Sequence, residues 1–180
     1  MAYFIFILIL ALIVFILYWL IEMAAMYIKD ISPKIPSQNR MRAHVADQIH
    51  KEMPDVKTVL DIGACSGGMV FRLAKGFPDA MVSGIEIMPA PYILSQIYRI
   101  FRPRNTKFHL GNALNFIKDR HFDVAVCYLL PGVMGKIQEY ADHFDMIFVL
   151  DFPFPDLKPY KKITLHSDFM GDHVLYVYRS

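Results

Sequence analysis

The sequence predicts a doubly wound α/β domain with a mostly parallel sheet, preceded by one N-terminal transmembrane helix. Apolar runs alternate with amphipathic segments through short connections, which is typical of parallel strands joined by helices. A glycine-containing loop follows the apolar run at residues 58–62, at the strand end where such sheets bind ligands. Residues 2–21 contain no charged side chain, and about 20 apolar helical residues match the roughly 30 Å hydrocarbon core of a bilayer.

The N-terminal segment, residues 1–31, is expected to be a membrane anchor with its juxtamembrane part, and residues 32–180 to be the globular domain. Tyr18 and Trp19 lie near the end of the apolar run, where aromatic rings favour the headgroup level. A cleaved signal peptide is the alternative, but no cation precedes the run and no convincing cleavage site follows it. By the positive-inside rule the domain lies on the cytoplasmic side, because the flanking cations all follow the run; they are Lys29, Lys34, Arg40 and Arg42.

The elements of the domain are predicted from apolar spacing and from the prolines and glycines that end each segment. Two closely spaced prolines make residues 32–37 a linker. The last strand is expected to be antiparallel. The expected strands span 58–61, 80–86, 106–110, 122–128, 146–151, 162–165 and 174–178, and the expected helices span 38–51, the segment from the glycine loop to Gly76, the segment from Pro89 or Pro91 to Arg102, and 132–142.

The loop after the first strand carries the chemistry of the predicted site. It reads D-I-G-A-C-S-G from Asp61 to Gly67. Gly63 and Gly67 have no Cβ, so the backbone there can approach a ligand. Glu86 ends the next strand at roughly the 20-residue offset at which a carboxylate grips two ribose hydroxyls. A nucleoside is therefore expected beside this loop, and a simple tight turn is the alternative.

Asp61 and Cys65 indicate which nucleoside to expect. Dinucleotide-binding loops read G-x-G-x-x-G, whereas Cys65 takes the place of the middle glycine here. The Asp61 carboxylate would repel a pyrophosphate but suits a cofactor with a positively charged amino group. S-adenosylmethionine is therefore favoured over NAD. The pattern resembles motif I of the class I S-adenosylmethionine-dependent methyltransferases, which implies cofactor contacts from Asp61, Gly63, Cys65 and Gly67.

Three further segments resemble one family of methyltransferases. They are K-I-P-S at 34–37, C-Y-L-L-P at 127–131 and D-F-P-F-P-D-L-K-P at 151–159. In this order they are similar to the membrane-anchored protein-lysine methyltransferases, the family that includes enzymes modifying the ATP synthase c subunit and the adenine nucleotide translocase. The resemblance covers most of residues 33–178. It implies a Rossmann-like class I fold and methylation of lysine in a membrane-associated protein.

The family commonly reads D-x-G-S-G-D-G-R through motif I, so this chain departs from it at Cys65, Ser66 and Gly68. One carboxylate and one guanidinium near the cofactor are thereby lost. Asn112 follows the third strand, where the class commonly has an acid that reads the adenine amino group, and an amide oxygen also accepts from that group. Two alternatives stay open: a noncatalytic cofactor-binding scaffold, and a methyltransferase of a lipid or small amphiphile.

The acceptor side is expected after the fourth and fifth strands, at the ligand-binding edge of the sheet. Methyl transfer needs an aligned, unprotonated amine in a site without water. An apolar wall would lower the pKa of a lysine amine from its ordinary value of about 10.4. We expect Tyr128 and Asp151 to be catalytic, with an ordinary strand residue and a turn residue as the alternatives. The expected substrate wall consists of Leu129, Pro131, Phe152 and Phe154.

Composition argues against several other kinds of site. The two cysteines provide no disulfide framework and suit a reducing compartment. Seven scattered histidines without an i, i+4 pair predict no metal site. The net charge is +2 with dispersed cations, so no nucleic-acid partner is expected. The expected partners are the lipid bilayer and a membrane-associated protein substrate.

Overall fold

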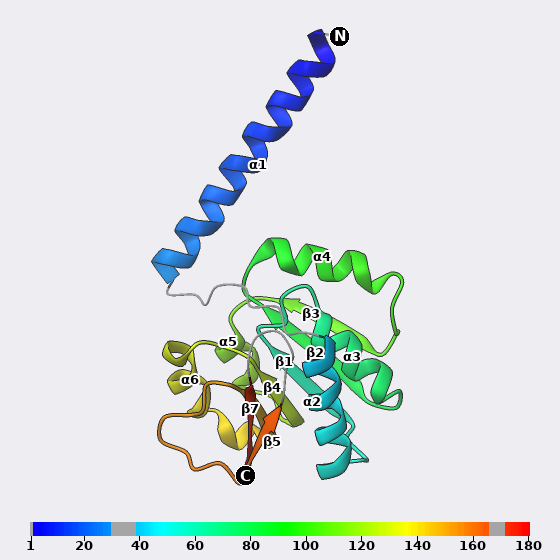
Figure 1. The fold of residues 1–180 in the computed structure, drawn as a ribbon, viewed down its shortest axis with the longest axis vertical. Coiled ribbons are helices and arrows are strands. Elements are labelled where there is room, and N and C mark those ends of the chain that lie inside the picture. Colours follow the sequence, from blue (N-terminus) through cyan, green and yellow to red (C-terminus); the bar gives the residue numbers. More distant parts are fainter. Residues whose placement is uncertain (1, 30–38, 166–171) are drawn as a thin grey trace. The chain divides into compact units, whose positions relative to one another are not determined.

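The computed structural model describes residues 2–29, 39–165 and 172–180 (Figure 1). The chain separates into two compact units, Met1–Pro33 and Lys34–Ser180. Helix α1, Ala2–Lys29, forms the first unit. Within the described residues, no helix reaches the combination of length and apolar character that crossing a membrane requires. The predicted transmembrane helix is therefore not confirmed, and the predicted linker at 32–37 lies outside the described residues.

The second unit is built on a seven-stranded sheet in the order β3-β2-β1-β4-β5-β7-β6. Strands β1 to β5 pair in parallel, whereas β7 is antiparallel to both β5 and β6. The strand order reverses between β1 and β4, so a ligand crevice is expected at the carboxyl ends of these two strands. The strands are β1 Thr58–Ile62, β2 Met81–Glu86, β3 Thr106–Leu110, β4 Phe122–Cys127, β5 Phe144–Leu150, β6 Lys161–Leu165 and β7 His173–Arg179.

Helices cover both faces of the sheet (Figure 1). Helices α2 and α3 contribute to one buried apolar cluster, and α5 and α6 contribute to a second. The apolar spacing that predicted α2 is confirmed, because Met41, Val45 and Ile49 are all buried. The helices of this unit are α2 Asn39–Glu52, α3 Gly68–Gly76, α4 Pro89–Arg99, α5 Ala113–Ile117 and α6 Pro131–Gln138, with a 3₁₀ turn, η1, at Ala141–His143.

The doubly wound fold and the antiparallel last strand are thus as predicted, and four details differ apart from one-residue shifts at the ends of elements. The helix expected to reach Arg102 ends at Arg99. Helix α5 was not predicted. Strand β5 begins at Phe144 rather than at residue 146. The helix expected over 132–142 ends at Gln138 and is followed by η1. None of these differences moves the carboxyl ends of β1 and β4, which position the site.

Candidate functional site

The loop between β1 and α3 has a conformation that its glycines permit. Gly63 has a φ of 81° and Gly67 a φ of 87°, in the left-handed region that favours glycine. A Cβ at Gly63 would lie 2.6 Å from the Leu129 side chain, and one at Gly67 would lie 2.5 Å from the Phe108 ring. Both glycines therefore make room for neighbouring side chains of the protein. Gly63 is also exposed, whereas Gly67, which was predicted to contact the cofactor, is buried.

Glu86 and Asn112, the residues expected to hold the adenosine, both bind backbone groups. The Glu86 carboxylate is 8% exposed and accepts the N–H groups of Cys65 and Met88, each at 2.8 Å. It therefore ties the β1–α3 loop to the start of α4. The Asn112 side chain is exposed and accepts the N–H of Leu114 at 2.9 Å, which caps α5. Each oxygen keeps a further lone pair, so the ribose and adenine contacts stay predictions.

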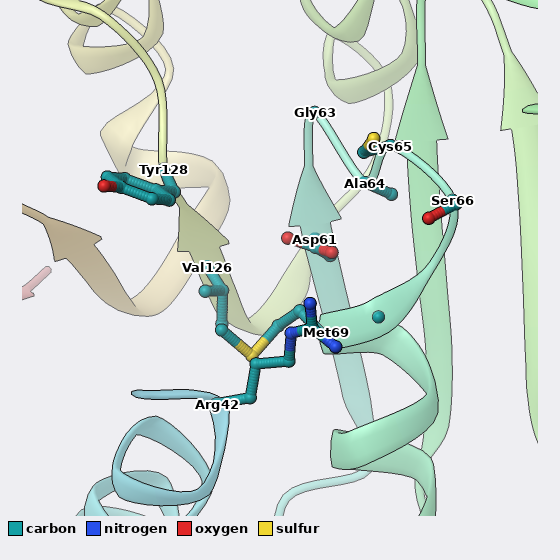
Figure 2. A pocket seen from close by; sticks show the side chains of 10 residues that line it. Arg42, Asp61, Gly63, Ala64, Cys65, Ser66, Met69, Val126 and Tyr128 are labelled. Atoms are coloured by element: carbon teal, nitrogen blue, oxygen red, sulfur yellow. The ribbon is translucent and has the colours of Figure 1, made fainter. Parts of the chain in front are cut away.

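A pocket lies beside the β1–α3 loop, on the face of the sheet that α2 and α3 cover (Figure 2). Four of the residues predicted for the site line it together: Asp61, Gly63, Cys65 and Tyr128. Arg42, Ser66 and Met69 are among the other lining residues. The pocket thus joins the end of β1 to the end of β4, the two strands between which the winding reverses.

Asp61 and Arg42 give this pocket one acidic and one basic side chain. Asp61 is 6% exposed, and burial, reinforced by the charge of Glu86 and opposed by Arg42, raises its pKa to about 7. Arg42 is half-buried, and burial lowers its pKa while Asp61 opposes that change. Figure 2 shows Arg42 reaching from α2 towards the start of α3. Its guanidinium occupies the place where a side chain at Gly68 would begin.

Arg42 is a functional candidate that the sequence reasoning missed, because it was counted only among the cations that orient α1. Its position carried a usable signal. Arg42 stands three, four and seven residues before Val45, Ala46 and Ile49, which are buried on α2, so it lies on the buried face of that helix. It also supplies a guanidinium beside Gly68, where the resembled family has an arginine.

A second polar group lies at the ends of β4, β5 and β7. The Asp151 carboxylate accepts from His173 Nδ1 at 2.8 Å, from the Val174 N–H at 3.0 Å and from the Tyr128 hydroxyl. Burial and the Asp151 charge raise the pKa of Tyr128 to about 12, which keeps its hydroxyl neutral near pH 7. His173 was not predicted; its Nε2 is buried and has no hydrogen-bond partner among the described residues.

The predicted substrate wall is distributed differently. Phe154 is 3% exposed, packs against Tyr178 with 4.7 Å between the centroids of the tilted rings and donates its N–H to the Tyr178 hydroxyl. Phe152 packs against the same cluster, which is the one that contains α5 and α6. Pro131 is exposed in the first turn of α6. Of the four wall residues, half-buried Leu129 is the one that packs against the β1–α3 loop.

Solved structures share this architecture over most of the chain. An RNA methyltransferase from Salinibacter ruber in complex with S-adenosyl-L-homocysteine is similar with a TM-score of 0.61 and 22% identity, over 81% of this chain and 93% of that one. A putative O-methyltransferase from Klebsiella pneumoniae has a TM-score of 0.63 and 12% identity, over 82% and 84% of the two chains. A precorrin-6y C5,15-methyltransferase from Geobacter metallireducens has a TM-score of 0.61 and 13% identity, over 83% and 92%. The chain has the fold of class I S-adenosylmethionine-dependent methyltransferases.

Sequence comparison adds one weak similarity to an enzyme with this kind of activity. The chain is 27% identical over 109 residues to a tRNA (guanine-N(7)-)-methyltransferase of Kluyveromyces lactis. The match covers 59% of this chain but only 39% of that relative. No protein-family model matches the chain.

The residues of the pocket fit S-adenosylmethionine, the cofactor of this methyltransferase fold. Asp61 and Arg42 present opposite charges in one pocket, complementary to the α-ammonium and α-carboxylate of the cofactor's methionine part. The Glu86 carboxylate, at the end of β2, is held by the N–H of Cys65. The adenosine part of the cofactor would therefore bind near the ends of β2 and β3. When bound, the cofactor supplies an electrophilic methyl group on its sulfonium.

Proposed function

We propose that this protein is an S-adenosylmethionine-dependent N-methyltransferase that modifies lysine side chains of membrane-associated proteins. The observation that carries the proposal is the Asp61 and Arg42 pair beside the left-handed glycine loop after β1. An anion and a cation at this spot suit the zwitterionic methionine part of the cofactor, whereas a dinucleotide would bring phosphates towards Asp61. The segments shared with the protein-lysine methyltransferases support lysine as the acceptor.

Tyr128 is the residue we assign to the incoming amine. It lines the same pocket as Asp61, and its hydroxyl is neutral, so its oxygen can accept a hydrogen bond from an amine N–H. Asp151 already accepts from Tyr128, His173 and Val174. We therefore assign Asp151 to holding the Tyr128 hydroxyl in place rather than to taking the substrate proton.

The reaction then needs alignment more than acid–base chemistry. A neutral lysine amine held by Tyr128 points its lone pair at the methyl carbon, and Leu129 beside the loop helps to exclude water. With the cofactor bound, the new N–C bond would form as the C–S bond breaks, and S-adenosylhomocysteine would leave as the neutral thioether. The methylated ammonium would then release a proton to water.

The proposed setting is the cytoplasmic face of a membrane, with α1 as the contact to lipid. The described side chains of residues 3–18 and Leu20 are exposed, and all of them are apolar or aromatic. A helix that is apolar on every side is expected to be covered by lipid or protein. Cations that follow α1 in the sequence favour anionic headgroups. Attachment would raise the local concentration of membrane-bound substrates.

The test incubates the full chain with membranes and S-adenosylmethionine labelled in the methyl group, and then separates protein, RNA and lipid. We expect label in protein, released as methyllysine on acid hydrolysis. Asp61→Asn should lose this label, whereas Asp79→Asn, which changes an exposed carboxylate after α3, should keep it. Label confined to the organic extract would indicate a lipid acceptor, label in RNA an RNA acceptor, and cofactor binding without label a scaffold. Each of these results would overturn the lysine proposal.

A further inference from the structure

Helix α4 exposes its apolar side chains to solvent. Only Pro91 and Ser95 of this helix are buried. The exposed fractions reach 49% at Ile97, 75% at Ile100 and 82% at Phe101. An amphipathic helix in a globular domain normally turns its apolar stripe to the core. Helix α4 turns Pro91, Ser95 and half-buried Tyr92 inward and leaves its other large apolar side chains exposed.

These side chains form a continuous feature along α4 and the turn after it, which we call the α4 patch. Contiguous exposed apolar surface of this kind marks an interaction site. The α4 patch consists of Ile93, Leu94, Ile97, Tyr98, Ile100 and Phe101.

The charged residues in the sequence segment that contains the α4 patch are all cations. Residues 87–118 contain no aspartate or glutamate. The cations of this segment are Arg99, Arg102, Arg104, Lys107 and Lys118. A helix with an apolar face and a basic border is suited to lie in the interface of an anionic bilayer, with its rings among the acyl chains and its cations at the headgroups.

We propose that the α4 patch docks the methyltransferase domain on an anionic lipid surface. Other occupants explain the observations less well. RNA would use the cations but leave six apolar side chains without a partner. A second copy meeting this one across a two-fold axis would bring like charges together. The α1 segment 2–21 has no charged residue to offer the arginines. The inference rests on the proposed membrane setting and not on methyl transfer.

The experiment uses the full chain bound to vesicles of phosphatidylcholine and phosphatidylglycerol that contain a photoactivatable diazirine lipid. After irradiation, mass spectrometry maps the labelled peptides, and label in α1 serves as the internal reference. We expect label within residues 89–104, reduced several-fold in vesicles of phosphatidylcholine alone. Arg99→Gln with Arg104→Gln should reduce it similarly. Arg72→Gln with Lys75→Gln, which removes two exposed cations from α3, should leave it unchanged.

Label in α1 without label in residues 89–104 would overturn the docking proposal. So would equal labelling with and without phosphatidylglycerol, or protection of α4 by RNA, by α1 or by a second copy in place of lipid. Calorimetry with S-adenosylhomocysteine on the same samples separates this proposal from the proposed function. If the chain binds S-adenosylhomocysteine but α4 is not labelled, only the docking proposal is refuted. If α4 is labelled but S-adenosylhomocysteine does not bind, only the methyltransferase assignment is refuted.

Discussion

Replacing Arg42 by glutamine should weaken the binding of S-adenosylhomocysteine while sparing ligands that lack its amino acid part. Arg42 is half-buried at the start of α3, in the pocket that Asp61 also lines. A hydrogen bond to a charged group contributes about 1.5–3 kcal/mol. At about 1.4 kcal/mol for each tenfold change, the dissociation constant should rise about 10- to 150-fold.

The assay is calorimetric titration of the full chain with two ligands. S-adenosylhomocysteine carries the α-carboxylate, and 5′-methylthioadenosine keeps the adenosyl thioether but has no amino acid. We expect Arg42→Gln to lose affinity for the first ligand and to bind the second as the parent chain does. Arg42→Lys should recover part of the loss, because it keeps the charge but not the planar fork. Arg72→Gln, at an exposed position on α3, is the matched control.

Two results would refute the reasoning about Arg42. One is an equal loss of affinity for both ligands, which would mean that the substitution damages the pocket as a whole. The other is unchanged binding of S-adenosylhomocysteine. If the parent chain bound neither ligand, the assignment of the cofactor itself would fail. Unfolding curves of each variant show whether the domain has stayed intact.

Four further outcomes are expected. Because the pKa of Asp61 is about 7 in the free protein, affinity for S-adenosylhomocysteine should rise about 25-fold between about pH 5.5 and 7.5, as the ionised fraction of the carboxyl group rises. Asp61→Asn should abolish this rise in calorimetry. The same raised pKa lowers the free energy of unfolding as pH rises from about 4 to 7, since the folded chain keeps a proton that the unfolded chain releases. Urea unfolding at several pH values measures this decrease, and an equal decrease in Asp61→Asn would show that Asp61 does not cause it. Gly67→Ala should lower the free energy of unfolding in urea by about 1–3 kcal/mol, because Gly67 has a φ of 87° and the new Cβ would meet the Phe108 ring. The control is Gly76→Ala, whose new Cβ has no atom within 4 Å, and an equal loss in both variants would contradict this reasoning. Tyr128→Phe should lower kcat about 10- to 100-fold with little change in the KM for S-adenosylmethionine, and an unchanged kcat would remove Tyr128 from the reaction.

The sequence predicts the sheet well where strands are apolar and bounded by turn residues. The strand at 106–110 has the predicted limits, and the antiparallel last strand is confirmed. Helix α5 escapes prediction because five residues are too few to show a helical period. The strand expected to start at residue 146 begins two residues earlier, at Phe144, because the exposed Asp145 does not interrupt it; a single outward-facing residue is ordinary within a strand.

The site is predictable where its residues lie in the glycine loop or directly follow a neighbouring parallel strand. Asp61, Gly63 and Cys65 follow from the local pattern, and Tyr128 follows from the rule that parallel strands present their carboxyl ends together. Arg42 depends on how α2 packs against α3. His173 depends on the register of an antiparallel strand, which no local pattern near the loop specifies.

The aromatic residues after β5 show a different limit of sequence reasoning. Phe152 and Phe154 alternate with prolines, and the sequence predicted that their rings belong to the substrate wall. Whether an aromatic ring faces a ligand or the interior depends on the path of the backbone. Here the Phe154 ring lies on Tyr178, so the ring stabilises the segment that holds Asp151 rather than contacting the pocket.

The position of β7 has a consequence for how the chain is made. This strand lies between β5 and β6, yet residues 173–179 leave the ribosome after both of them. Until then the backbone of β5 has one edge without a partner, and all but one of its seven residues are buried in the finished sheet. Nascent chains that stop before that point would expose β5 as an unpaired edge strand, which can pair with the same strand of another chain. Solubility during synthesis therefore depends on how promptly the final hairpin arrives.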